Sequence, residues 1–354
     1  MAYLAGLIVL DAPASALNNA GADAGARTDN VVTVKRIRTA SGTIPYVSAQ
    51  AFRYWWRTTA AQEPGWVAAP VFREAKIAYA DANPVANWDD DLFGYMRAPS
   101  KKTDAGSVEG TTPLEKDREI TRVSPVRVST FVAVAPSPIV TDFGTMTRQN
   151  GDPVPHEHEF YRAHLRGLLS IDLTSTGTFY DTQRVGIKNM DSNRREAARA
   201  AECTEMVVRG QKAWRLPLDQ RRHRLEVLLG ALAALNGGAK QALHYTDLTP
   251  AVVALAVVRH ANNPFHRLLG ASRTHETIFH RKAFDEAVDV YKSDFLSDIY
   301  LGWAENFLDD ERAACVTAVE ASSLKDRIHL GHPVTAIQHM ARAVAAPESG
   351  GWFA

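Results

Sequence analysis

The chain has 354 residues, of which 45% are hydrophobic and 23% charged, so it is long enough for a large globular core and does not have the composition of a disordered protein. Its 40 basic and 40 acidic residues balance, which excludes a uniformly basic nucleic-acid binder. Two cysteines are too few for a disulfide framework or a zinc knuckle and favour a reduced, cytoplasmic protein. The longest apolar run, residues 251–258, is too short to cross a membrane, and we expect no membrane role.

The charges are unevenly distributed along the chain. Residues 27–57 contain six basic side chains and one acidic one, and residues 184–224 contain eleven basic and five acidic ones. Residues 285–326 reverse the balance, with eleven acidic and three basic side chains. This pattern suits a protein that offers one face to phosphate and another to a basic partner, although solvated faces that segregate by chance explain it equally well.

The first elements are predicted from apolar patterning and capping residues. Residues 4–10 form a continuous apolar run that predicts a buried strand, and residues 18–30 are rich in turn-forming side chains. Residues 31–38 alternate apolar and basic side chains, which predicts a strand with Lys35 on an open face. Ser48 is a predicted N-cap for a helix over residues 49–61.

The middle of the chain is less regular. Residues 64–114 are rich in Pro, Gly, Asp and aromatic residues and are interpreted as an insertion with some helix, and residues 126–134 predict a strand. Hairpin and loop signals follow from residue 136 to residue 186. Residues 197–208 favour a helix, and residues 221–236 give the clearest helical pattern, with Gly237 and Gly238 as its expected end.

A buried strand is predicted over residues 252–259, and residues 273–346 have mainly helical patterns. The predicted elements therefore run strand, helix, strand, strand, helix, strand, with long insertions. This is the order of an α+β, RRM-like (ferredoxin-like) sandwich, which periodicity alone leaves as one of several topologies.

Three polar and basic clusters lie at the ends of predicted elements: Asn18 and Asn19, then residues 35–38 with the helix at 48–57, then residues 237–241. Arg53 and Arg57 are four residues apart and Gln50 precedes Arg53 by three, so we expect all three on one helix face, where donors suit phosphate. Plain turns and helix termination also explain the asparagines and glycines.

Catalytic and metal motifs are weak. Residues 156–159 read His-Glu-His-Glu, but this is not the HExxH spacing, so we expect no metal and no cofactor. His260, His266, His275 and His280 have the chemistry of an acid and base for RNA cleavage, yet no spacing fixes a pair. We therefore assign no catalytic residue and expect a protein that is not an enzyme.

Several segments, in one order over about two thirds of the chain, resemble the CRISPR-associated autoregulator DevR family, the backbone subunits of type I Cascade complexes. The matching segments are Leu17-Asn18-Asn19, Val34-Lys35-Arg36-Ile37-Arg38, residues 45–53 (PYVSAQAFR), residues 90–96 (DDLFGYM), residues 125–130 (PVRVST), residues 156–161 (HEHEFY) and residues 237–247 (GGAKQALHYTD).

The resemblance implies an RRM-like palm that spans the chain as a single domain with insertions. It implies a fingers-like insertion at about 62–124, a thumb β-hairpin at about 136–190 and a helical part at 273–346. Copies of such subunits stack along a guide RNA (crRNA) and present it for pairing with a target DNA strand, while base pairing reads the sequence.

Carried over by position, the RNA-binding residues would be Asn18, Asn19, Lys35, Arg36, Arg38, Ser48, Gln50, Arg53, Arg57, Lys240 and Gln241, with Arg184 and Lys188 as weaker candidates. The expected partners are the crRNA, other copies of the chain, and the large subunit, the small subunit, the crRNA 5′-end-binding subunit and the crRNA-processing endoribonuclease of the complex. Residues 91–96 are assigned to packing or subunit contact, and Asp23 and Asp29 are not expected to cleave RNA.

Two alternatives remain open. One is a CRISPR RNA-processing endoribonuclease, which would need a working histidine or a metal. The other is a DNA-binding transcriptional autoregulator, although the sequence contains no evident helix-turn-helix pattern with a basic second helix.

Overall fold

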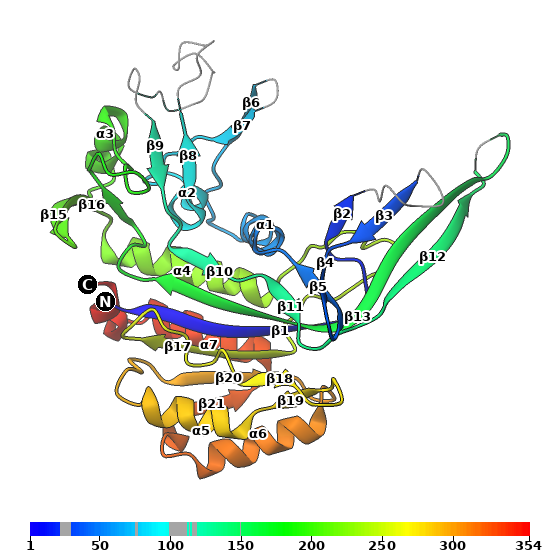
Figure 1. The fold of residues 1–354 in the computed structure, drawn as a ribbon. Coiled ribbons are helices and arrows are strands. Elements are labelled where there is room, and N and C mark those ends of the chain that lie inside the picture. The colour runs from blue at the N-terminus through cyan, green and yellow to red at the C-terminus, as the bar shows by residue number, and fades with distance from the viewer. Residues whose placement is uncertain (22–29, 75–76, 99–111, 113, 115–118, 149) are drawn as a thin grey trace.

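The computed structural model describes residues 1–354 except 22–29, 75–76, 99–111, 113, 115–118 and 149 (Figure 1). Asp23, Asp29 and part of the predicted 62–124 insertion therefore lie outside the described residues. Within the described part, the chain is a mixed α/β fold built on one large sheet, which confirms the predicted mixture of strands and helices. No helix in that part is long and apolar enough to span a bilayer.

Twelve strands of the described chain form this sheet. Its path runs β21 (Ile328–Gly331), β20 (Ile299–Trp303), β17 (Val252–Val258), β1 (Tyr3–Ser15), β13 (Val154–Asp172), β11 (Phe131–Ala133), β5 (Gly42–Val47) and β4 (Arg36–Thr39). The remaining members are β10 (Val126–Val128), β12 (Ile139–Met146) and β3 (Val31–Val34), which all pair with β13, and β2 (Asn19–Gly21), which pairs with β3. The β20–β21 and β3–β13 pairings are parallel, and the other pairings in the sheet are antiparallel.

The two central strands β1 and β17 are buried on both faces, which explains their continuous apolar sequences. Successive side chains of a strand point to opposite faces, so Leu4 and Ile8 of β1 join one core while Leu7 and Val9 join another. The first core includes α1 (Ala49–Ala60), α4 (Leu218–Ala233) and α7 (Pro333–Ala345). The second includes α5 (Arg281–Val290) and α6 (Asp309–Ala321), so the sheet has helices on both faces.

Smaller elements complete the fold. A three-stranded sheet consists of β14 (Thr178–Tyr180), β16 (Gln211–Arg215) and β15 (Thr204–Val208). The helix α3 (Ser192–Ala200) lies between β14 and β15 in the sequence. Three hairpins are formed by β6 (Val71–Glu74) with β7 (Ile77–Ala80), β8 (Tyr95–Arg97) with β9 (Ile120–Arg122), and β18 (Leu269–Ala271) with β19 (Thr277–Phe279). The short helices are α2 (Trp88–Phe93), η1 (Lys325–Arg327) and η2 (Pro347–Phe353).

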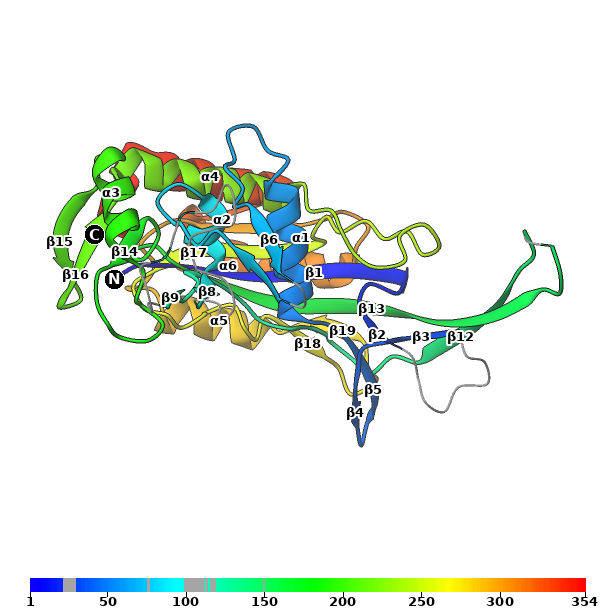
Figure 2. The ribbon, with the colours of Figure 1, turned by 90° about the horizontal axis from the view of Figure 1, so that it is seen from above.

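The hairpin of β12 and β13 projects from the body of the molecule in both views (Figures 1 and 2). It lies inside the 136–190 range in which the thumb is expected. The first half of the 19-residue strand β13 pairs with β12, from Val154 opposite Met146 to Tyr161 opposite Ile139. Its second half pairs with β1, so the projecting arm and the central sheet share one continuous strand.

The structure differs from the predicted elements where a local break overrides periodicity. The single strand expected at 31–38 is divided into β3 and β4 at Lys35, whose N–H and carbonyl bond to Asn18 and Tyr46. The helix expected at 197–208 is wrong, because α3 ends at Ala200 and β15 begins at Thr204 after Glu202 adopts a positive φ of 55°. Strands β19, β20 and β21 alternate with the helices between residues 273 and 346, so this part is mixed.

The predicted start of α1 is confirmed. Ser48 is the N-cap, and its hydroxyl accepts a hydrogen bond from the Ala51 N–H at 3.3 Å. Phe52 and Trp56 are fully buried, and Phe52 stacks on Phe131 of β11 with ring centroids 4.1 Å apart. The aromatic side of α1 therefore anchors the helix to the sheet.

A buried ionic network joins α2 and β9 to α4 and to the turn before β14. The carboxylate of Asp91, in α2, is completely buried and accepts hydrogen bonds from Arg122 of β9 and from Arg224 of α4, the latter at 2.7 Å. The Gly177 N–H donates to both oxygens of the same carboxylate at 3.1 Å. Both guanidinium groups also donate to backbone carbonyls, so the charges are paired and their donors satisfied.

We expect Asp91→Asn to lower the free energy of unfolding by about 3–5 kcal/mol, because it leaves two buried guanidinium charges without their carboxylate. Urea denaturation of the purified protein measures the change. The control is Asp285→Asn, which removes a partly exposed carboxylate paired with Arg281 one helical turn away and should cost no more than about 0.5 kcal/mol. Equal losses in the two variants would contradict the structural role of Asp91.

Candidate nucleic-acid interface

The first two predicted clusters, the asparagines at 18–19 and the segment 35–38 with the start of α1, lie together at the base of the projecting hairpin. Asn18 follows β1, and its side-chain oxygen accepts the Ser48 N–H at 2.9 Å. Its backbone carbonyl accepts the Lys35 N–H at 3.0 Å. One asparagine thus fixes the start of α1 and the junction of β3 and β4 to each other. Asn19 begins β2, and its buried side-chain oxygen has no hydrogen-bond partner in the described part of the chain.

The third cluster, residues 237–241, docks at the same place. The Ala239 N–H donates to the Leu17 carbonyl at 3.0 Å. Gly237 has φ +153° and lies against Trp55 of α1, where an added Cβ would be only 2.4 Å from the indole ring. These glycines do not end the preceding helix as predicted, since α4 already ends at Ala233. They instead allow the backbone to pass tightly over α1 and deliver Lys240 to the hairpin base.

Three of the predicted RNA-binding side chains bond mainly within the protein. Arg36 donates to both carboxylate oxygens of Glu159 at 2.8 Å. Arg53 points inward and donates to the carbonyls of Phe93 and Val126 and to the Ser124 hydroxyl. Burial, and to a smaller degree the Arg57 charge, lowers the pKa of Arg53. Gln241 bonds to the backbone of Gly237 and Thr246 and so closes its own loop.

Gln50, Arg53 and Arg57 therefore do not share one exposed helix face, contrary to the prediction from the sequence. Arg53 turns into the protein because buried carbonyls at the end of α2 and in β10 need donors. Gln50 is exposed at the first turn of α1, and Arg57 lies 5.8 Å from the ring centroid of the exposed Tyr54. Arg38 is exposed on the β4–β5 hairpin. Gln50, Arg57 and Arg38, with the half-buried Lys35 and Lys240, are the predicted donors that remain available to a ligand.

Lys240 lines a cavity of about 670 Å³ between the 237–243 loop, β3 and the hairpin arm. The other walls are Asn30 to Val32 at the start of β3, Met146 and Val154 at the end of the hairpin pairing, His156 and Glu157 of β13, and Leu243. The backbone of Lys240 is left-handed, with φ +56°, which is uncommon for a residue with a side chain. The cavity thus combines the cation of Lys240 and the carboxylate of Glu157 with apolar and imidazole walls. Its flat apolar and imidazole surfaces suit a nucleotide base.

A histidine cluster beside this cavity is a feature that sequence reasoning missed. The rings of His158 and His244 have centroids 4.9 Å apart, and Asp142 Oδ2 lies 3.4 Å from His158 Nε2. The hairpin register places Asp142 directly opposite His158. A two-residue periodicity applied across the predicted hairpin could have paired them, but only the fold brings His244 to the same place. No group of three potential metal ligands occurs among the residues that the structure describes.

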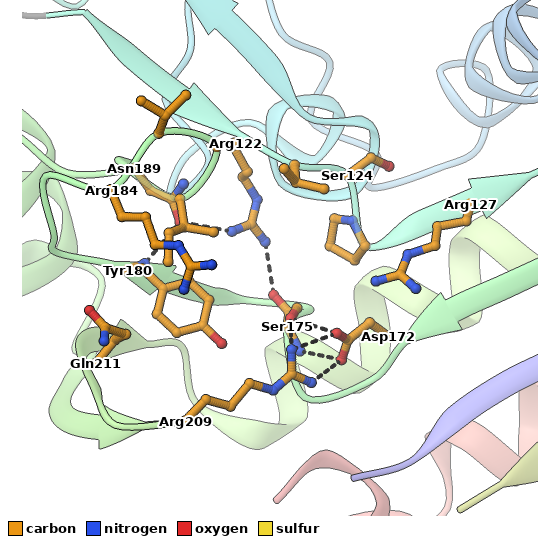
Figure 3. A pocket seen from close by; sticks show the side chains of 15 residues that line it. Arg122, Ser124, Arg127, Asp172, Ser175, Tyr180, Arg184, Asn189, Arg209 and Gln211 are labelled. Carbon is orange, nitrogen blue, oxygen red and sulfur yellow. Dashed lines mark hydrogen bonds and ion pairs between the residues drawn. The ribbon is translucent and has the colours of Figure 1, made fainter. Parts of the chain in front are cut away.

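Arg184 and Lys188 lie elsewhere, at the opposite end of β13. Arg184 lines a pocket with Arg122, Arg127 and Arg209 beside the three-stranded sheet (Figure 3). Lys188 is half-buried, and its carbonyl accepts the Thr121 N–H. The structure therefore separates these two residues from the cluster at the hairpin base.

Burial and the neighbouring His244 lower the pKa of His158, and burial lowers the pKa of His164. Their folded pKa values thus lie below the usual 6.5 of histidine, so the unfolded chain binds protons more readily. Both histidines stabilise the fold fully above about pH 6.5, and this stability is lost as the pH falls through their folded pKa values.

We expect the urea concentration at half-unfolding to decrease as the pH is lowered from 7 to 5. The decrease should be smaller in His158→Gln and smallest in the double variant that also carries His164→Gln. Denaturation series at three pH values measure the slopes. A His158→Gln slope equal to that of the original chain would contradict this assignment.

No family model matches the chain, and no curated protein matches it. Solved structures do share its fold. A chain described as "CRISPR RNA-guided surveillance complex, pre-nicking" is 12% identical, with a TM-score of 0.51, and the match covers 97% of this chain and 100% of the other. A chain described as "CRISPR RNA-guided surveillance complex" is 14% identical, with a TM-score of 0.49 over 96% and 99% of the two chains. The first of these likenesses establishes a common fold.

Proposed function

We propose that the chain is a non-catalytic subunit that binds guide RNA and repeats along it to form the backbone of a type I CRISPR surveillance complex. The guide would be held by its phosphates and its shape, which leaves its bases free to pair with a target DNA strand. The partners would be the crRNA, further copies of the chain and the other Cascade subunits named above.

The observation that carries this proposal is the end-to-end fold match to a chain of an RNA-guided surveillance complex, over 97% of this chain and all of the other. The resemblance of the sequence segments to the DevR family points to the same role. Fold alone does not fix function, so the proposal also needs a surface of suitable chemistry.

The order of the strands supports an RRM-like palm. Neighbouring strands β17, β1 and β13, followed by β10 and β11 on β13, correspond to the order fourth, first, third, second of a βαββαβ unit. The helices α1 and α4 contact each other and share the core on one face of these strands. Strands β20 and β21 and the helices α5 and α6 would then be additions, and the hairpin of β12 and β13 would be the thumb.

The surface at the hairpin base supplies the RNA-binding chemistry. Arg38, Gln50, Lys35 and Lys240 present donors there, and none of them forms an ion pair within the described residues. Arg57 lies two turns further along α1, where its charge also acts on Asp89 of α2. Arginine and lysine side chains of this kind contact phosphates and fix the register of a strand without reading its sequence. Asn18, Ser48, Arg36, Arg53 and Gln241 would act indirectly, by holding the elements that carry these donors.

Guide-RNA binding should weaken when single donors at the hairpin base are neutralised. For Lys240→Gln and Arg57→Gln we expect lower affinity for single-stranded guide RNA and a salt-dependence slope smaller by about 0.7 for each lost phosphate contact. Fluorescence anisotropy at several salt concentrations measures both quantities.

The matched control is Arg273→Gln, which removes an exposed arginine from the turn between β18 and β19. Its affinity and slope should equal those of the original chain. Purification with and without nuclease should also show salt-sensitive assemblies of the chain around RNA. Cleavage of the RNA by the purified protein would favour the endoribonuclease alternative, and sequence-specific binding of duplex DNA would favour the transcriptional regulator.

A further inference from the structure

A second concentration of arginines lies far from the hairpin base, at the opposite end of β13. It surrounds a cavity of about 370 Å³, within the size range of small-ligand pockets, roughly 300–1,000 Å³. Arg122 comes from β9, Arg127 from β10, Arg184 from the loop after β14, and Arg209 from the turn between β15 and β16 (Figure 3). Four separate segments thus direct guanidinium groups to one place.

Two of these arginines are neutralised inside the protein. Arg122 is buried and bonds to Asp91, to the Ser175 and Thr178 carbonyls, and to Asn189. Arg209 forms a two-bond ion pair with Asp172, with both nitrogen–oxygen distances 2.9 Å. These two pairs make the pocket wall rigid and set its shape.

The position of Arg209 is unusual for its residue type. Val208 pairs with Gln211, so Arg209 and Gly210 form a two-residue hairpin loop, with φ values of +53° and +72°. Such turns favour Asn, Asp or Gly at their first position, because a side chain is strained at positive φ. An arginine here indicates that its side chain is needed at the pocket.

The other two arginines, Arg127 and Arg184, form no ion pair within the described residues. Arg127 and Arg184 are exposed and have no carboxylate partner among the described residues, and Arg127 lies only near the Tyr3 ring, 6.0 Å from its centroid. Of the four lining arginines, Arg122 is neutralised by Asp91 and Arg209 by Asp172, so four minus two leaves a charge of +2 at the pocket, from Arg127 and Arg184. The pocket is therefore electrostatically complementary to a multiply charged anion.

One buried donor also lacks a partner. Tyr180 is only 5% exposed, and its hydroxyl has no hydrogen-bond partner in the described part of the chain. Figure 3 shows its ring between Arg184 and Arg209, with the hydroxyl directed into the pocket. Buried hydroxyls in native proteins nearly always have a partner, so this one points to a missing ligand. A water molecule would satisfy the hydroxyl alone, whereas an anion would accept from the hydroxyl and also pair with the exposed guanidinium groups of Arg127 and Arg184.

We propose that this pocket binds a phosphate group, carried by a nucleotide or by a nucleic-acid strand. Phosphate oxygens accept from arginine forks and from a tyrosine hydroxyl at once, which a carboxylate does less completely. The exposed side chains of Val123 and Val185 at the same pocket give an apolar surface for the organic part of the ligand. The argument uses only residues of the pocket and stands whether or not the guide-RNA proposal holds.

Calorimetric titration of the full chain with adenosine 5′-monophosphate at low salt tests the phosphate site, and adenosine is the ligand control. We expect binding of the monophosphate and none of the nucleoside. Arg127→Gln and Arg184→Gln should each weaken binding about tenfold, the usual effect of losing one charge-assisted hydrogen bond. Tyr180→Phe removes only the hydroxyl and should weaken binding about fivefold with an unchanged melting temperature.

Arg273→Gln removes the same charge at a distant exposed site and should leave monophosphate binding unchanged. An equal loss in this control would overturn the proposal, because the binding would then be unspecific electrostatics. Equal binding of adenosine and its monophosphate, or no binding of either, would overturn it as well.

Competition identifies the source of the phosphate. Displacement of the monophosphate by a short single-stranded RNA, with RNA affinity reduced in Tyr180→Phe, assigns the pocket to a strand phosphate. Monophosphate binding that RNA does not displace assigns it to a free nucleotide. The Lys240→Gln measurement of guide-RNA binding is separate, so either proposal can fail without the other.

Discussion

The buried carboxylate of Asp91 is the interaction on which the arrangement of the molecule depends. It binds Arg122 on one side and Arg224 on the other, and so connects α2, β9 and the long helix α4. A buried charge without its partner is strongly unfavourable, so these three segments can only come together as a set. Arg122 then serves twice, because its other donors fix Ser175 and Asn189 in the wall of the arginine pocket. The same network thus determines the fold of the insertion and the shape of a candidate binding site.

The two candidate binding surfaces, the hairpin base and the arginine pocket, lie at opposite ends of β13. Its first half belongs to the projecting hairpin and its second half to the central sheet, with both faces of that sheet covered by helices. A strand with both halves paired cannot bend freely, so the hairpin base and the arginine pocket stand at fixed positions at its two ends. This separation is what a protein needs if it is to hold an extended ligand at one end and a second phosphate-bearing group at the other.

Several features of the fold follow from local sequence. The continuous apolar runs of β1 and β17 predict strands buried on both faces, and Ser48 before an amphipathic segment predicts the start of α1. These predictions succeed because their causes lie within a few residues. Two features depend on partners that are distant in sequence: the division of 31–38 into two strands and the strand at 204–208 in place of a helix. Periodicity within a segment carries no information about such partners.

The sequence by itself determined a mixed α/β chain, the cluster of polar and basic residues near both ends of α1, and the unusual glycines at 237 and 238. Only the tertiary structure decided which donors are free. Arg53 and Arg57 look equivalent in the sequence, yet buried carbonyls of β10 and α2 engage the first and leave the second open. The pocket draws Arg127 from β10, and Tyr180 and Arg184 from β14 and the loop after it, and it has no sequence signature. The physical reason is that a charge is available or neutralised according to what lies within a few ångströms of it, and in this chain those neighbours come from distant parts of the sequence.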